Sequence, residues 1–111
     1  MGIDPLDVQT VREAMTGRLI GSEIVHHEVL GSTMDEAARI AEKGCNEGVV
    51  VFAEAQTQAR GRFGRSWISP ARQNVYCSVV LKPPTKLLNY INMAACIAVV
   101  DSIRSLSGLS A

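Results

Sequence analysis

Two short β-branched runs, separated by a long segment without apolar periodicity, constrain the fold of this chain more than any other feature. Residues 48–56 read GVVVFAEAQ and residues 74–82 read NVYCSVVLK. Each run is too short for a buried helix and is rich in residues that favour strands. Since neighbouring strands joined by a loop are commonly antiparallel, the two runs predict an antiparallel pair.

The first half of the chain carries two helical patterns around a further strand. Asp4-Pro5 is typical of a helix start, with proline at the first helical position. A short strand is predicted over residues 23–29. Thr33 and Glu36 form a capping box, so a second helix is expected to begin there and to end at Gly44.

The last third of the chain is dominated by one more helical pattern. Residues 86–106 are apolar on most sides of that helix, which predicts a helix at the centre of the domain. With 111 residues, the chain forms one domain at most. The order of elements predicts an α+β fold, with a mixed, partly antiparallel sheet flanked by helices on at least one face.

Charge is distributed unevenly along the chain, although the formal net charge is zero. Residues 1–54 hold ten acidic and four basic side chains, whereas residues 55–111 hold one acidic and seven basic side chains. This asymmetry indicates a localised basic surface and hence an anionic ligand. The alternative is that the two halves pack together and neutralise each other.

The segment between the two runs begins with an arginine- and glycine-rich stretch, residues 56–67, QTQARGRFGRSW. A solvated surface loop is the simplest interpretation. Arg/Gly segments with an aromatic residue also contact phosphates and stack on bases in nucleic-acid-binding modules. In a nucleotide-binding enzyme, glycines let the backbone approach the ligand while arginines bind phosphate oxygens. The stretch is neither a P-loop nor a Rossmann fingerprint.

The cellular compartment is suggested by the cysteines and by the apolar runs. The three cysteines have no metal-ligand spacing and imply no disulfide framework, and Cys77 and Cys96 are expected in the core. The first residues lack the apolar segment of a signal peptide. The longest apolar run, INMAACIAVV, is too short for a bilayer, which takes about 20 residues. We therefore expect a cytoplasmic protein with no membrane association.

Three stretches together resemble the biotin–protein ligase family. QTQARGRFGRSW is similar to that family's Arg/Gly signature loop, which follows a strand ending in glutamine. GSTMDEAARIA resembles its Ser-Thr-Asn helix start, and SPARQNVYCSVVLKP resembles its following strand. The resemblance covers about residues 24–106 and implies the fold of class II synthetases and biotin–lipoate ligases.

The resemblance implies a two-step reaction. Biotin and ATP, with Mg²⁺, give biotinyl-adenylate, and a lysine of a biotin carboxyl carrier protein or domain then takes the biotinyl group. Two other functions remain open: a ligand-binding fragment without catalysis, and an Arg/Gly-loop module that binds nucleic acid. No DNA partner is expected, because the overall positive charge of such proteins is missing.

The site residues are implied by the same resemblance, position by position. Ser32, Thr33, Met34, Gln56, Arg60, Gly61 and Arg62 match the biotin side, and Arg60, Arg62, Arg65 and Trp67 match the ATP or adenylate side. Arg62 and Arg65 are the expected catalytic residues, and no metal ligand is expected from the protein. Without the family, Trp67 would be interpreted as a core anchor.

Several departures from the family pattern shape the expectations. Ala59 replaces a glycine, so its backbone must avoid a glycine-only conformation, and Met34 replaces an asparagine. The family's Lys-Trp-Pro-Asn lysine has no counterpart. We therefore expect residues 1–111 to be part of a catalytic domain, without its C-terminal part, the small barrel or a DNA-binding domain. Such a chain should ligate poorly alone and could form homo-oligomers through an exposed sheet edge.

Overall fold

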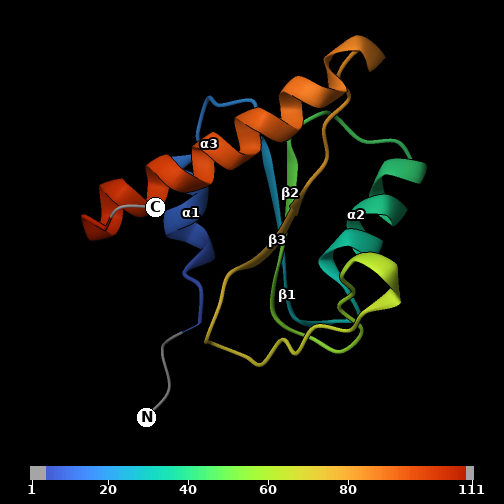
Figure 1. Ribbon diagram of the computed structural model, residues 1–111, viewed down its shortest axis with the longest axis vertical. Helices are drawn as coiled ribbons and strands as arrows, with labels where there is room; N and C mark the ends of the chain where they lie inside the picture. Colours follow the sequence, from blue (N-terminus) through green and yellow to red (C-terminus); the bar gives the residue numbers. More distant parts are fainter. Residues whose placement is uncertain (1–4, 110–111) are drawn as a thin grey trace. The chain divides into compact units, whose positions relative to one another are not determined.

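The computed structural model describes residues 5–109 and contains a three-stranded sheet with helices (Figure 1). The chain divides into two compact units, residues 1–81 and 82–111. The elements are α1 (Val8–Ala14), β1 (Glu23–Leu30), α2 (Thr33–Glu42), β2 (Val49–Gln56), β3 (Tyr76–Val79) and α3 (Leu88–Ser107), with short turns at Arg62–Gly64 and Thr85–Leu87.

The sheet has the order β1-β2-β3, with β2 in the middle. β1 runs parallel to β2, and their register places Leu30 opposite Gln56 at the ends of both strands. β2 and β3 are antiparallel, with Val50 opposite Val79. The predicted α+β fold with a mixed, partly antiparallel sheet is therefore confirmed.

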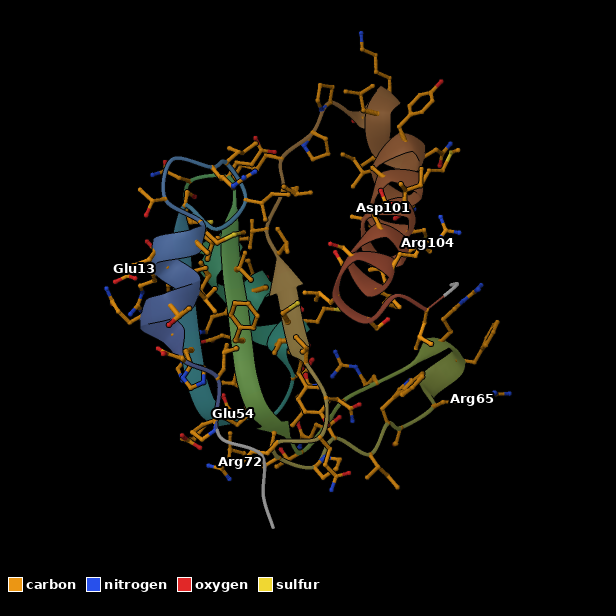
Figure 2. All side chains as sticks on the ribbon, turned by 90° about the vertical axis from the view of Figure 1, so that its left-hand side faces the viewer. Glu13, Glu54, Arg65, Arg72, Asp101 and Arg104 are labelled. Atoms are coloured by element: carbon orange, nitrogen blue, oxygen red, sulfur yellow. The ribbon has the colours of Figure 1, made fainter. Side chains whose placement is uncertain are left out.

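The core lies between α2 and the middle of the sheet. Val49 and Val51 of β2 are fully buried and pack in one cluster with Ala37 of α2 and with Val80. Alternation along β2 sends Glu54 to the opposite face. Figures 1 and 2 show α1 and α2 on opposite faces of the sheet. Helices thus cover both faces, and the buried valines hold α2 against the strands that carry the site.

Helix α1 begins later than the sequence predicts. Its N-cap is Asp7, whose Oδ1 accepts the N–H of Thr10 at 3.2 Å. The predicted helix start at Pro5 is wrong, because Pro5 precedes the helix. Asp4, the predicted cap, lies outside the described residues. The N–H of Leu6 donates to the Glu54 carboxylate instead, which ties this segment to the sheet before the helix starts.

Helix α2 begins at the predicted residue but with a different cap. Ser32 is the N-cap, and its Oγ accepts the N–H of Met34 at 3.2 Å. Glu36 pairs with Arg39 rather than closing a capping box. The capping box expected from Thr33 and Glu36 is therefore wrong, because a tertiary contact, described below, takes the N–H of Thr33.

The C-terminal elements differ from expectation in packing. β3 covers only the middle of the predicted strand, residues 74–82. α3 has about the predicted length, yet none of its residues is buried, so its central position is not confirmed. Cys77 and Cys96 are exposed, which corrects their assignment to the core. Within residues 82–109, only the short turn Thr85–Leu87 is available to pack against α3.

The segment Thr85–Ser107 is long and apolar enough to cross a bilayer, judged by length and composition. A single such helix is weak evidence for a membrane span, because core helices of soluble proteins meet the same criterion. The apolar run INMAACIAVV is shorter than this helix, because further apolar residues lie on both sides of the run.

Candidate functional site

The candidate site lies where the two parallel strands end. β1 and β2 finish side by side, and the chain leaves them toward the N-terminus of α2 and toward the Arg/Gly segment. The N–H of Thr57 donates to Leu30 O at 3.0 Å, and the N–H of Gln58 to Gly31 O at 2.7 Å. Crevices at the carboxyl ends of such strands are common ligand sites in α/β folds.

A partly buried polar network forms the floor of the site. Gln56 Oε1 accepts the N–H of Thr33 at 2.8 Å, while Gln56 Nε2 donates to Ser69 Oγ at 3.4 Å. Thr33 Oγ1 lies 2.8 Å from Ser78 Oγ on β3. The glutamine amide thus links the first turn of α2 to the returning chain. This network rigidly positions Ser32 and Thr33, because buried hydrogen-bonded groups are costly to displace.

The Arg/Gly segment is a bulged hairpin rather than an irregular loop. Gln56 pairs with Ser69 at its base, and Arg60 pairs with Ser66 further out. The N–H of Trp67 donates to Ala59 O at 2.9 Å between these two bridges. Ala59 does not have a positive φ, which confirms that this position avoids a glycine-only conformation.

The tip of the hairpin has the pattern of a type I′ turn. Phe63 and Gly64 both have positive φ, 61° and 72°, and the N–H of Arg65 donates to Arg62 O at 3.3 Å. Type I′ turns match the twist of paired strands, but they favour glycine or asparagine at both positions. A left-handed phenylalanine is therefore strained. Phe63 is 87% exposed. The Arg62 guanidinium lies over its ring, with Arg62 Cζ 5.2 Å from the ring centroid.

An open pocket of about 510 Å³ lies above the polar floor. This volume is in the range of small-molecule sites, roughly 300–1,000 Å³. Its lining combines polar side chains with apolar and aromatic ones. The lining residues are Ser32, Thr33, Met34, Gln56, Ala59, Arg60, Trp67, Ile68, Ser69, Asn74, Val75, Tyr76, Cys77 and Ser78.

Arg60 is the basic side chain in this lining, and it is held by an acid. Its Nη1 donates to Asp35 Oδ2 at 2.9 Å, and its Nη2 to Asp35 Oδ1 at 2.5 Å. The hydrogen bonds from Arg60 lower the pKa of the Asp35 carboxyl below its ordinary value. Both side chains are about half-exposed, so a ligand can reach them.

The other predicted arginines do not join this pocket. Gly61, Arg62 and Arg65 line a separate surface cavity of about 550 Å³ together with Phe63 and Ser66. Figure 2 shows Arg65 pointing outward from the hairpin. Trp67 lines both cavities and is 66% exposed, so it is not a core anchor. Six of the predicted site residues therefore come together, namely Ser32, Thr33, Met34, Gln56, Arg60 and Trp67.

Several residues at the site were not predicted from the sequence, and three of them, Asp35, Ser69 and Ser78, make the hydrogen bonds described above. Ser78 carried a usable signal, because it is a hydroxyl within an otherwise apolar strand run. Ser69 carried none beyond its position near the end of the Arg/Gly segment. Asp35 is typical of any first helical turn, where acids favour the helix dipole. Its pairing with Arg60 depends on the fold.

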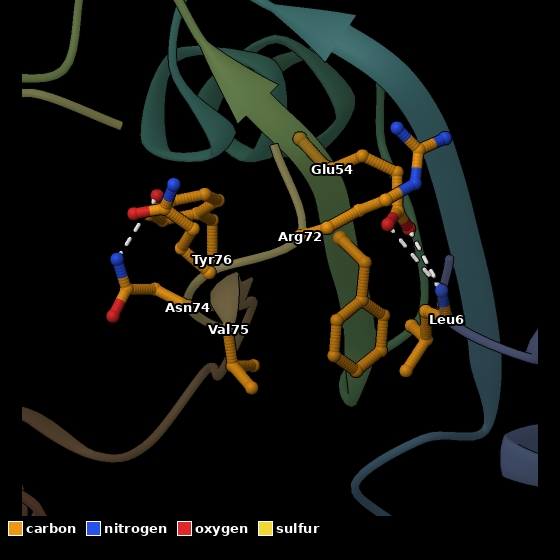
Figure 3. Close-up of a pocket in the computed structure, with 9 residues that line it drawn as sticks. Leu6, Glu54, Arg72, Asn74, Val75 and Tyr76 are labelled. Carbon is orange, nitrogen blue, oxygen red and sulfur yellow. Dashed lines mark hydrogen bonds between the residues drawn. The ribbon is translucent and has the colours of Figure 1, made fainter. Parts of the chain in front are cut away.

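A second pocket, of about 250 Å³, lies against the other face of the sheet (Figure 3). Glu54 at its wall is only 7% exposed. Its carboxylate accepts His26 Nε2–H at 2.5 Å and the N–H of Leu6 at 3.2 Å. The His26 hydrogen bond is the main cause that lowers the Glu54 pKa, with the Leu6 N–H and Arg72 adding to it. This carboxylate is already satisfied within the protein.

Comparisons with known proteins agree with the resemblance seen in the sequence. The profile of the Biotin/lipoate A/B protein ligase family matches residues 27–110. The Bifunctional ligase/repressor BirA of Bacillus subtilis is 31% identical over 106 residues, which are 94% of this chain and 33% of that protein. The Biotin--[acetyl-CoA-carboxylase] ligase of Mycobacterium tuberculosis is 36% identical over 109 residues, 92% of this chain and 40% of that protein. The chain thus spans about a third of the first relative and two fifths of the second.

Proposed function

Because this chain belongs to the Biotin/lipoate A/B protein ligase family, we propose that it takes part in the ATP-dependent attachment of biotin to a carrier protein. In the first step, a carboxylate oxygen of biotin bonds to the α-phosphorus of ATP, and pyrophosphate leaves. In the second step, a lysine Nζ of the carrier attacks the carbonyl carbon of biotinyl-adenylate. The amide forms, AMP leaves, and the nitrogen loses a proton.

The observation that carries this proposal is the meeting of Ser32, Gln56 and Arg60 in one pocket at the strand ends. Ser32 and Thr33 would face the head group of biotin, with Met34 adding apolar contact. Gln56 holds the first turn of α2 in place through its bond to Thr33. A hydroxyl donor that is held in place in this way, such as that of Ser32, can stabilise developing negative charge without reorganising.

The hairpin would supply the phosphate side of the site. Arg60 already lies at the rim of the pocket, and the Trp67 indole offers a flat face for adenine. For Arg62 and Arg65 to reach the phosphates, the tip must fold over the ligand. Closure of that kind would also exclude water from the adenylate, which is prone to hydrolysis.

Mg²⁺ is expected to arrive with ATP. The ion usually binds through substrate phosphates and one or two carboxylates. Within residues 5–109, no group of three or more His, Cys, Asp or Glu side chains gathers as a metal site. The Asp35 carboxylate is paired with Arg60, which lines the pocket. We therefore assign the ion to the phosphates, whose mutual repulsion it screens when bound.

The acceptor proposed here is a biotin carboxyl carrier protein or domain, by analogy with the acetyl-CoA carboxylase named for the Mycobacterium tuberculosis relative. We expect the protein to act in the cytoplasm. Ligation by the 111-residue chain alone is expected to be weak, because among the described residues no lysine lines the pocket. Pairing of a second copy along an exposed edge of the sheet stays a prediction.

The test is binding and adenylate formation by the purified chain. Isothermal titration with biotin and with ATP measures binding, and biotin-dependent exchange of labelled pyrophosphate into ATP measures the first step. Gln56→Ala is expected to weaken biotin binding at least about tenfold, because the buried N–H of Thr33 loses its acceptor. Gln73→Ala, which removes an exposed glutamine at the other pocket, serves as the matched control.

Two results would argue against this function. Wild-type chain that binds neither biotin nor ATP contradicts the proposal directly. Equal biotin affinities for Gln56→Ala and Gln73→Ala would place the biotin site elsewhere. Binding without pyrophosphate exchange would support the alternative of a ligand-binding fragment without catalysis.

A second candidate function rests on the hairpin tip. An exposed aromatic ring, that of Phe63, lies under the Arg62 guanidinium in a surface cavity that Arg65 also lines, which suits single-stranded nucleic acid. Salt-dependent retention of an oligonucleotide, lost in Phe63→Ala, would favour this function. Retention of biotin and ATP binding in the same variant would show that the two surfaces act separately.

A further inference from the structure

The arginine at the pocket rim is held by a carboxylate of the neighbouring helix. Arg60 and Asp35 form two parallel hydrogen bonds, from Nη1 to Oδ2 and from Nη2 to Oδ1. This geometry matches a planar guanidinium to a planar carboxylate. Asp35 belongs to the first turn of α2, and Arg60 belongs to the hairpin. The pair therefore ties the hairpin to the helix whose N-terminus faces the pocket.

The position of this tie along the hairpin matters for its motion. At the base, backbone bonds from Thr57 and Gln58 already fix the hairpin to the end of β1. Further out, the Arg60–Asp35 pair is the hydrogen-bonded side-chain link from the hairpin to α2 among the described residues. Breaking the pair would free the outer hairpin, including Arg62 and Arg65, while the base stays in place.

An exposed pair of this type is readily exchanged for another partner. Water and salt screen it, so its contribution is small. A polyphosphate offers several negative charges and can bind a guanidinium at two points. A polyphosphate can therefore take the arginine from Asp35, whereas a ligand without phosphate cannot.

We propose that Asp35 is a positioning residue, which holds Arg60 and the outer hairpin in the free chain and releases them to a polyphosphate. This inference rests on the proposed function, because it concerns the ATP side of the same pocket. It assigns to Asp35 the contact that the phosphates of ATP must displace to recruit Arg60.

Binding by variants tests the competition between Asp35 and the ligand. Asp35→Asn keeps the size of the side chain and removes its charge, and Glu42→Gln on the exposed side of α2 is the matched control. ATP and tripolyphosphate are expected to bind Asp35→Asn about two- to fivefold more tightly than wild type. Adenosine, which lacks phosphate, is expected to bind all three proteins equally. A merely structural role for Asp35 would alter adenosine binding as well.

Limited trypsin cleavage without ligand tests the tie to α2 on its own. Cleavage after Arg62 or Arg65 tracks the population of the opened hairpin. Asp35→Asn and Arg60→Gln are each expected to speed this cleavage about two- to fivefold, and the double variant no further. Asp35→Glu retains a carboxylate and is expected to restore slow cleavage.

The outcomes separate the two proposals. Wild-type cleavage rates in Asp35→Asn, or ATP affinity that is unchanged or lower in that variant, overturn the role of Asp35. Absence of ATP binding in every variant overturns the proposed function and the release of Arg60 by polyphosphate together. The inference is supported if Asp35→Asn binds ATP more tightly than wild type but binds adenosine equally, and if trypsin cleaves the ligand-free variant faster.

Discussion

At the scale of single residues, the space beside Gly61 sets the shape of the hairpin. A Cβ on Gly61 would lie 2.2 Å from Trp67 Nε1, well inside van der Waals contact. The backbone of Gly61 has φ −99°, which any residue can adopt. Glycine is therefore needed at this position for room and not for backbone freedom, and the indole of Trp67 fills that room.

Gly61→Ala is expected to push the Trp67 ring away from the hairpin. Because this is the single tryptophan of the chain, its fluorescence reports the change directly. We expect emission at longer wavelength, stronger quenching by acrylamide, and a loss of about 1 kcal/mol in stability from overpacking. Gly31→Ala is the control, since its Cβ would meet its nearest atom, Gln58 Oε1, at an ordinary 3.4 Å. Identical spectra for the two variants would contradict the role given to Gly61.

The sequence predicted which residues lie at the site better than it predicted which residues they contact. Ser32, Gln56 and Arg60 were singled out by a motif, and the structure brings them into one pocket. Arg62 and Arg65 belong to the same motif, yet they lie at the hairpin tip, because the turn at Phe63 directs the chain outward. A motif fixes which side chains are present, whereas their directions depend on backbone angles that it does not encode.

At the scale of elements, the turn before β2 depends on a close backbone approach. Gly48 has φ +100°, its N–H donates to Val80 O at 2.8 Å, and its carbonyl accepts the N–H of Gly21. A Cβ on Gly48 would lie 1.8 Å from Leu19 O, a backbone atom that cannot move without the whole loop. This glycine therefore fixes where the central strand enters the sheet.

Gly48→Ala is expected to destabilise the chain by roughly 3 kcal/mol or more, because left-handed strain adds to a backbone clash. Gly44→Ala is the matched control: it has φ +88°, but a Cβ there meets nothing within 4 Å. The control should lose only about 1 kcal/mol. Urea unfolding followed by circular dichroism measures both values. Equal losses would show that backbone strain alone, without the clash, accounts for the glycine.

Element types were predictable from sequence, but their caps and packing were not. The β-branched run over residues 48–56 gave the central strand almost to the residue, because few other structures suit it. The cap of α2 was misassigned between two adjacent hydroxyls, since the bond from the N–H of Thr33 to Gln56 depends on a residue 23 positions away. Apolar character likewise predicted the helix α3, but it carries no information on what covers that helix.

At the scale of the whole molecule, the two oppositely charged halves of the chain partly neutralise each other. Arg60 pairs with Asp35, and Arg72 lies 3.7 Å from Glu28, so two bases of the second half meet acids of the first. Arg65, at the outer tip of the hairpin, has no acidic partner within residues 5–109. Both interpretations of the charge asymmetry therefore hold in part, because some bases of the second half pair with acids of the first while, among the described residues, Arg65 of the hairpin does not.

One buried carboxylate links this charge distribution to the stability of the fold. Glu54 joins β2 to His26 of β1 and to the N–H of Leu6, and the Arg72 side chain lies beside it in the same pocket (Figure 3). Its pKa in the folded chain is lowered from the ordinary value of 4.5. A lowered pKa means that the ionised form contributes stability above about pH 4.5, and that this contribution is lost as the pH falls through the lower folded value.

Glu54→Gln is therefore expected to change both the size and the pH dependence of stability. At pH 7 the variant should lose about 1–3 kcal/mol, because the amide cannot accept both hydrogen bonds as a carboxylate does. Below pH 4.5 its free energy of unfolding should fall less steeply than that of wild type, so the two curves converge. Glu42→Gln, which changes an exposed acid of α2 on the other face of the sheet, is the matched control for replacing a carboxylate by an amide. Urea unfolding measured from pH 3 to 7 gives these curves, and a constant offset between wild type and Glu54→Gln would show that Glu54 does not couple folding to protonation.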